Sequence, residues 1–386
     1  MSSDRDVLKL VDEFAAKEVS PRAAQMDSED RLASELIETA SKIGLLSLHL
    51  DGDGEVDLRQ MPLIHETTER IAAESPAIAA VISGFRHLSL LLKRHGSSIV
   101  VDRWYDSTLR GKTFGSFCLT EPQAGTDLRG IKTVATRAEG GWKLSGHKMW
   151  IGNAGVASFA IVLCKNGSEA RDAKMLALVV DTSSKGVVGK RGPAMSGFRG
   201  MPNGTYDFDN VFVPDDYVLN VDGFRGMING VNMARVEAAS YACGILRASL
   251  QASVDRACSR EAFGSIIGDL PSIQSKIGRI AADYHAAREL TLRAAESFAA
   301  HPGGEPDIIS MAKMFASDAA RRGSDAAMQI HAASGIPFSE PVGRMNRDAK
   351  ITQIFDGTSE VHETMLGRHA VSQGLASGLN TPFLPR

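Results

Sequence analysis

Cysteine is scarce in this chain of 386 residues, and the four cysteines lie far apart. Cys118, Cys164, Cys243 and Cys258 form no C-x-x-C pair, so the sequence indicates neither a zinc site nor a disulfide framework. This usage is typical of proteins of the reducing cytosol, and we expect a cytoplasmic location.

Long hydrophobic runs are also absent. The longest, Ser158–Cys164 and Lys174–Val180, are far shorter than the roughly 20 residues that cross a bilayer. The N-terminus is charged and lacks the apolar core of a signal peptide. The formal net charge is −3 and the basic residues form no stripe, so we expect neither nucleic acid nor a membrane as partner. The ten histidines form no ligand-spaced pair, and no metal site is predicted.

The residues that are present predict a large soluble protein with helices at both ends and strands between them. Apolar residues make up 43% of the chain and charged residues 23%, which is ordinary for a globular protein. Helical spacing of apolar residues covers 4–20, 31–43, 61–74, 77–95 and 97–110. Short β-like runs follow at 114–119, 133–138, 142–145, 158–164, 174–181 and 205–213. Helical spacing returns at 226–258, 271–300, 306–333 and 359–373.

This order predicts three domains. We expect an N-terminal α-helical domain at 1–112, a middle antiparallel β-barrel or sheet domain at 113–222, and a C-terminal four-helix bundle domain at 223–386. Helices and strands do not alternate along the chain, so we do not expect a doubly wound nucleotide-binding sheet.

Three stretches carry the chemistry. Residues 117–127 read FCLTEPQAGTD, and KMWIGNA follows at 148–154. Residues 260–264 read REAFG, and residues 347–360 read RDAKITQIFDGTSE. In this order, these stretches resemble the acyl-CoA dehydrogenase family over nearly the whole chain. The resemblance implies an acyl-CoA dehydrogenase-like fold, FAD as cofactor, and removal of an α-proton and a β-hydride from an acyl thioester.

The resemblance also implies which residues touch the flavin. Phe117, Leu119 and Thr120 would lie along it, with Trp150 beside the ring and Thr126 near the pyrophosphate. The turn that ends at Gly125 would let the main chain approach the cofactor without a side-chain collision. The remaining contacts implied in the same subunit are Ile151, Gly152, Thr358 and Glu360. Gly152 departs from the family, which often has a hydroxyl residue there.

A second set of residues resembles those that reach the FAD of a neighbouring subunit. Arg260 and Phe263 form the pair expected to do so, since a guanidinium suits a pyrophosphate. Gln329 and Ala333 match positions near the adenosine end. If each FAD site needs two chains, the protein is a homodimer or a homotetramer made of two dimers.

Asp356 is open to two interpretations. Alone, an Asp before Gly-Thr-Ser indicates a helix cap. By resemblance, it aligns with the glutamate that acts as the catalytic base, although it is one methylene shorter. Some family members place the base where this chain has Ala234, and Glu237 lies one helical turn further on. Asp356 is therefore the first candidate for the base and Glu237 the second.

The substrate remains open at this level. The thiol carrier is either CoA or an acyl carrier protein, and a hydroxyacyl group on a carrier protein, as in polyketide extender-unit formation, is favoured because a hydroxyl could suit a shorter base. An electron-transfer flavoprotein or another acceptor would take the electrons. Two alternatives are a flavin oxidase or monooxygenase on the same fold, since nitroalkane-oxidising relatives use an aspartate base, and a flavoprotein without catalytic activity.

Overall fold

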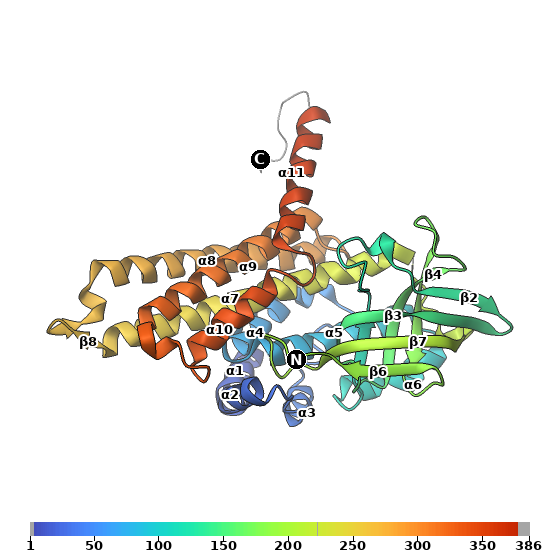
Figure 1. Cartoon of the computed structure of the whole chain (residues 1–386), viewed down its shortest axis with the longest axis horizontal. Coiled ribbons are helices and arrows are strands. Elements are labelled where there is room, and N and C mark those ends of the chain that lie inside the picture. Colours follow the sequence, from blue (N-terminus) through green and yellow to red (C-terminus); the bar gives the residue numbers. More distant parts are fainter. Residues whose placement is uncertain (1–3, 222, 377–386) are drawn as a thin grey trace.

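The computed structural model describes residues 4–221 and 223–376, with the side chains of 223–229 and 373–376 left out. Three groups of elements follow one another along the chain, as predicted: helices, a sheet, and long helices (Figure 1). The first helices are α1 (Asp4–Phe14), α2 (Ser20–Glu29), α3 (Glu35–Lys42), α4 (Met61–Glu74), α5 (Pro76–His95) and α6 (Ser98–Leu109). The last are α7 (Gly223–Ser259), α8 (Pro271–Ala300), α9 (Pro306–His331), α10 (Pro341–Thr352) and α11 (Ser359–Ala376).

Helix α5 lies between the sheet and the long helices. It packs on both α7 and the first strand. Ser75 begins it, because the Ser75 hydroxyl accepts a hydrogen bond from the backbone N–H of Ile78 at 3.4 Å and Pro76 suits the first helical position. Most of its side chains are buried on all sides, as expected of a helix surrounded by protein.

The middle sheet has seven strands in the order β1-β4-β2-β3-β7-β6, with β5 paired to β4. The strands are β1 (Gly115–Cys118), β2 (Val134–Ala138), β3 (Gly141–Gly152), β4 (Phe159–Asn166), β5 (Met175–Asp181), β6 (Val187–Arg191) and β7 (Asn203–Pro214). The sheet is mixed rather than purely antiparallel, because β4 pairs in parallel with β1 and β2. Both parallel pairs join strands separated by long connections, which sequence periodicity alone cannot reveal.

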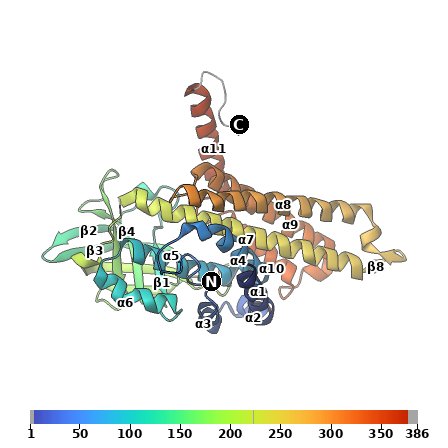
Figure 2. The same ribbon diagram turned by 180° about the vertical axis from the view of Figure 1, so that it is seen from behind.

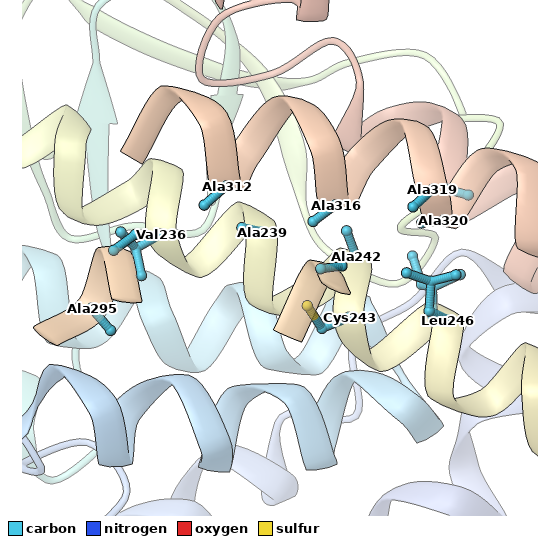
Figure 3. Close-up of a cluster of buried hydrophobic side chains, with 14 of the residues drawn as sticks. Val236, Ala239, Ala242, Cys243, Leu246, Ala295, Ala312, Ala316, Ala319 and Ala320 are labelled. Carbon is cyan, nitrogen blue, oxygen red and sulfur yellow. The ribbon is translucent and has the colours of Figure 1, made fainter. Parts of the chain in front are cut away.

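The long helices pack through small side chains. Ala312, Ala316 and Ala319 of α9 face Ala239 and Leu246 of α7 in the buried core (Figure 3). Alanine at these positions lets the helix backbones approach closely.

The fourth helix of this bundle is α10, which the sequence did not indicate. Only a few of its side chains are apolar and buried, among them Val342 and Ala349, so its helical period is weak. Helix α11, expected in the bundle, projects away from it instead (Figures 1 and 2).

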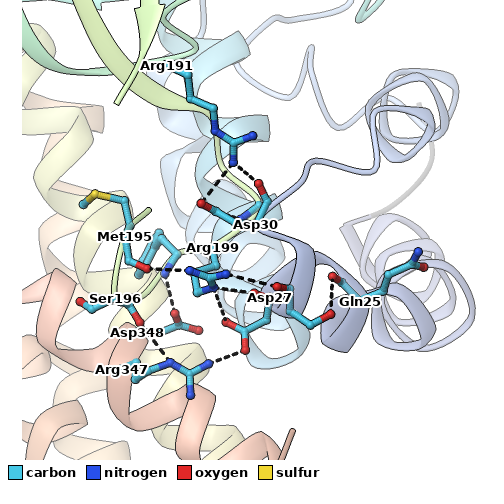
Figure 4. Close-up of polar contacts among 12 residues, drawn as sticks. Gln25, Asp27, Asp30, Arg191, Met195, Ser196, Arg199, Arg347 and Asp348 are labelled. Carbon is cyan, nitrogen blue, oxygen red and sulfur yellow. Dashed lines mark hydrogen bonds and ion pairs between the residues drawn. The ribbon is translucent and has the colours of Figure 1, made fainter. Parts of the chain in front are cut away.

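A polar cluster joins the three groups of elements at α10, the helix that precedes the candidate base Asp356 in the chain. Arg347 of α10 donates to the Ser196 carbonyl at 3.1 Å and pairs with Asp27 of α2, and Asp348 accepts from the Phe198 N–H at 2.6 Å (Figure 4). Arg199 donates to the Asp27 carbonyl at 2.5 Å. Burial raises the pKa of Asp348 to about 6. These contacts fix the position of α10, and therefore of the turn that follows it.

Candidate active site

A cavity of about 170 Å³ lies where α5, β1, α7 and the turn before α11 meet. Four residues predicted from the sequence line it: Phe117, Leu119, Gly152 and Asp356. Asp356 lies more than 200 residues after the other three in the chain, so tertiary packing alone brings it to them. Most of the remaining wall is apolar and comes from α5 and α7.

Asp356 sits in a tight turn between α10 and α11. Its φ is +55°, and Gly357 follows at +100°. Phe355 anchors the turn by packing its ring on those of Phe198 and Tyr241. The main chain is held by two cations, since Arg235 donates to the Asp356 carbonyl at 3.1 Å and Lys313 donates to the Gly357 carbonyl at 2.5 Å.

The Asp356 carboxylate forms no hydrogen bond with the described residues, and α11 begins only at Ser359. The structure therefore does not support the helix-cap interpretation. Burial raises the pKa of the Asp356 carboxyl, although Lys313, His87 and Arg235 act in the opposite direction. Burial also lowers the pKa of Lys313 to about 8. A carboxylate in an apolar cavity with a raised pKa has the character of a general base.

Glu237 has a different environment. Its side chain is fully buried and is not part of the cavity wall in the described structure. Arg86 Nη2 lies 2.5 Å from Oε1 and His87 Nε2 lies 2.5 Å from Oε2. Burial raises the pKa of Glu237, but His87 and Arg86 outweigh it and hold the pKa at about 2. A buried carboxylate that Arg86 holds at Oε1 and whose pKa is lowered is a poor proton acceptor, so the environment favours Asp356 over Glu237.

The predicted flavin contacts lie along β1 and the end of β3. Phe117, Leu119 and Thr120 are partly buried, and the Met149 N–H donates to the Thr120 carbonyl at 3.0 Å. Trp150 lies at a bulge with φ +58°, and its indole is 50% exposed. A positive φ is uncommon for an aromatic residue and indicates a functional constraint. Ile151 points the other way and is buried.

Gly125 and Thr126 are exposed on the turn that follows β1. This turn is fixed by the side chain of Glu121, which accepts from the backbone N–H groups of Lys132 at 2.6 Å and Thr133 at 3.1 Å. The Lys148 ammonium pairs with Glu121 at 2.8 Å and donates to the Leu119 carbonyl at 2.9 Å. This buried pair therefore joins the two stretches that the sequence assigned to the cofactor.

The open surface beside these strands fits a flat ring. The Trp150 indole is half exposed, and a Cβ at Gly152 would meet nothing within 4 Å. Asn153 Oδ1 is buried without a hydrogen-bond partner among the described atoms, so it is free to accept from a donor on a ring edge. Thr358 is half-buried and Glu360 exposed, directly after Asp356.

The remaining predicted residues lie far from this surface. Arg260 and Phe263 belong to the hairpin of β8 (Glu261–Ala262) and β9 (Ser265–Ile266), at the opposite end of the long helices from the sheet (Figure 1). Gln329 and Ala333 lie where α9 ends, near the same end of the bundle, because α9 runs back along α8. All four are exposed, and Phe263 is 95% exposed with φ +54°. One chain alone does not bring them to the other contacts.

Comparison with known proteins gives the family. The models for the N-terminal, middle and C-terminal domains of acyl-CoA dehydrogenases match residues 2–112, 116–211 and 221–371. The chain belongs to the acyl-CoA dehydrogenase family. The prediction of FAD as cofactor is confirmed by this membership.

Relatives match along almost the whole chain. An acyl-CoA dehydrogenase of Bacillus subtilis (strain 168) is 32% identical over 370 residues, covering 94% of this chain and 96% of the relative. The human mitochondrial short-chain specific acyl-CoA dehydrogenase is 32% identical and covers 94% and 89%. The structure of butyryl-CoA dehydrogenase from Megasphaera elsdenii superposes with a TM-score of 0.88 at 28% identity, covering 96% and 99%. The predicted acyl-CoA dehydrogenase fold is therefore confirmed.

Sequence reasoning missed several residues around the cavity: His87, Asn153, Arg235 and Lys313. Asn153 and Arg235 stand next to predicted residues and could have been noticed. His87 and Lys313 lie inside ordinary helical patterns and gave no signal. In the described ranges, no group of acidic, cysteine and histidine side chains could hold a metal ion, and no helix is long and apolar enough to cross a membrane.

Proposed function

We propose that this acyl-CoA dehydrogenase family member oxidises a short acyl thioester, with Asp356 as the base that removes the α-proton. One observation carries the proposal: Asp356 faces the same cavity as Phe117, Leu119 and Gly152, without a hydrogen bond to the described residues and with a raised pKa. FAD, when bound, supplies the acceptor for the β-hydride.

The residues that contact the main chain around Asp356 fix the position of its carboxylate. Arg235 and Lys313 hold the two carbonyls of the turn, so the carboxylate cannot swing away with the main chain. Because the side chain is one methylene shorter than a glutamate, and misplacement near 1 Å can lower a rate on the order of a hundredfold, the α-carbon must lie close to this turn. A fixed turn supplies that positioning, and the apolar wall excludes water from the proton transfer.

The cavity favours a short acyl group. Its volume is about 170 Å³, and part of its wall is formed by the proposed flavin contacts Phe117, Leu119 and Gly152, so the room left for an acyl group is small. Two relatives of this chain are named for butyryl-CoA and for short-chain acyl-CoA, which supports the same size class here.

We propose CoA as the thiol carrier, because these relatives are named for CoA esters. The variant that the sequence favoured, a hydroxyacyl group on an acyl carrier protein in polyketide extender-unit formation, stays a prediction without support among them. Comparing one acyl group on both carriers decides between the two.

We also propose that two chains complete each FAD site. The guanidinium of Arg260 and the ring of Phe263 are presented to solvent far from the flavin surface of their own chain. A homodimer, or a dimer of dimers, would bring this hairpin to a second copy's cofactor. An electron-transfer flavoprotein or another acceptor would then reoxidise the assembly.

An anaerobic titration of FAD-loaded protein with butyryl-CoA tests the function. The wild-type flavin absorbance should bleach, and Asp356→Asn should bleach on the order of 10²–10⁴-fold more slowly with FAD still bound. Glu237→Gln is the matched control and should bleach at a rate close to wild type. Bleaching of Asp356→Asn at the wild-type rate would remove Asp356 as the base.

The oxidase alternative is tested in the same cuvette by admitting air. A dehydrogenase should recover its absorbance slowly, whereas rapid recovery with peroxide formation would favour an oxidase. A protein that no acyl thioester bleaches would instead be a flavoprotein of another kind.

A further inference from the structure

We propose that His87 selects the substrate by binding an oxygen-bearing substituent, a hydroxyl or a carboxylate, that the acyl chain carries beyond its β-carbon. The enzyme would then prefer oxygenated short acyl thioesters over plain alkyl ones. This inference rests on the proposed function, since it concerns the acyl group that the same cavity receives.

His87 is the polar exception in the part of the cavity wall that α5 provides. Among the described lining residues, His87, Asn153 and Asp356 are the ones with polar side chains. Asp356 is the proposed base, and Asn153 stands at the end of β3, where its Nδ2 donates to the Gly115 carbonyl at 3.0 Å. His87 has neither role, and the helix around it contributes apolar side chains such as Leu88 and Leu91.

A buried ion cluster holds the histidine in place. Its Nε2 lies 2.5 Å from Glu237 Oε2, while Arg86 occupies Oε1. Arg86 is fixed in turn by the Leu45 carbonyl at 3.2 Å and by the hydroxyls of Thr68 and Ser83 at 3.0 Å each. Glu237 is fully buried, whereas the His87 side chain is 21% exposed. Of these three side chains, the imidazole is therefore the one that lines the cavity.

The second ring nitrogen is available. Nδ1 of His87 forms no hydrogen bond with any residue of the described ranges. With Nε2 facing Glu237, a charged ring donates from Nδ1 to a hydroxyl or a carboxylate, and a neutral ring accepts from a hydroxyl. An alkyl substrate would cover this polar nitrogen with carbon and leave it unpaired, which is unfavourable in an apolar cavity.

The other cations near the cavity are already engaged. Arg86 pairs with Glu237, and Arg235 and Lys313 donate to the main-chain carbonyls of Asp356 and Gly357. None of the three is among the described residues that line the cavity, so His87 is the basic side chain there that an oxygen of the acyl chain can reach. If His87 only balanced Glu237, substrate preference would not depend on it.

The test uses thioester pairs of equal shape. 4-Hydroxybutyryl-CoA is compared with pentanoyl-CoA, and 3-carboxypropanoyl-CoA with 4-methylpentanoyl-CoA. In each pair oxygen replaces carbon at the end of an acyl chain of nearly equal size, and in the second pair the oxygenated ester also carries a negative charge. The ratio of kcat/KM within each pair is measured for wild type, His87→Leu and His87→Gln. Dissociation constants for the same four esters are measured in an Asp356→Asn background, where chemistry is slow.

In wild type, at least one oxygenated ester should be preferred, and His87→Leu should lower that preference about 10- to 100-fold, the range expected for one hydrogen bond to a charged group. The ester pair whose kcat/KM ratio changes in the variant shows whether His87 binds a hydroxyl or a carboxylate. Glu38→Gln, exposed on α3 and outside the cavity wall, should leave the ratio unchanged. His87→Gln can still donate to an oxygen, so it should lower the preference less than His87→Leu does. If His87→Leu does not fold, His87→Met replaces it under the same criterion.

Two outcomes overturn the inference: ratios within twofold of wild type in the His87 variant, or a wild-type preference for the alkyl ester in both pairs. Failure of the proposed function looks different, since wild type would then oxidise none of the four esters. In that case, the ratios of the dissociation constants within each ester pair, measured with and without His87, still show whether His87 binds the oxygenated group.

Discussion

Replacing Glu237 by glutamine should destabilise the protein by about 3 kcal/mol without preventing removal of the α-proton. The carboxyl has a pKa of about 2 in the folded chain against an ordinary value of 4.5. A difference of about 2.5 units at about 1.36 kcal/mol each corresponds to about 3 kcal/mol of stabilisation of the folded state. Breaking a buried ion pair on one side costs a similar amount, about 3–5 kcal/mol.

The assay is calorimetric unfolding. With an unfolding entropy of about 2.1 cal/mol/K per residue over 386 residues, the loss corresponds to a Tm about 4 °C lower if the chain melts as one unit. Because the folded pKa is depressed, the stabilisation is fully present above pH 4.5 and is lost as pH falls towards 2. The difference between wild type and Glu237→Gln should therefore shrink in acid.

Glu38→Gln, on an exposed face of α3, is the control and should change the Tm by less than about 1 °C. The reasoning is refuted if the Tm of Glu237→Gln is as close to that of wild type as the Tm of Glu38→Gln is. If flavin bleaching by butyryl-CoA is lost while the Tm is unchanged, Glu237 and not Asp356 is the base.

Three further predictions concern the proposed base, the turn that follows β1, and the cofactor. For wild type, kcat/KM should fall as pH drops through the pKa of Asp356, which burial raises above 3.8, because a protonated carboxyl cannot take the α-proton; an acidic limb centred at or below 3.8 in the pH profile contradicts this. Lys148→Met should destabilise the protein by about 3–5 kcal/mol in urea unfolding, because it leaves Glu121 buried without its cation, whereas Lys143→Met, exposed on β3, should have little effect. Arg260→Ala should weaken FAD retention at least about tenfold, measured as the flavin-to-protein ratio after gel filtration. The control Arg293→Ala, exposed on α8, should retain as much FAD as wild type. Equal FAD retention by both variants would show that Arg260 does not bind the cofactor.

Much of the fold was readable from local pattern. The helical periods of α5 and α7 and the order of helices and strands all depend on neighbours close in sequence. Helix α10 was missed because few of its side chains are apolar, and its position depends on Arg347 and Asp348 contacting distant elements. The parallel pairing of β4 with β1 and β2 was missed because such pairing joins segments separated by long connections.

The sequence by itself was enough to predict the family, the cofactor and the first candidate for the base, because short stretches such as FDGTSE resemble those of acyl-CoA dehydrogenases. Only the tertiary structure favours Asp356 over Glu237 as the proposed base. Both are carboxylates, but Asp356 faces an apolar cavity and Glu237 is held between Arg86 and His87. A pKa depends on burial and on charges brought together by packing, and no local pattern contains that information.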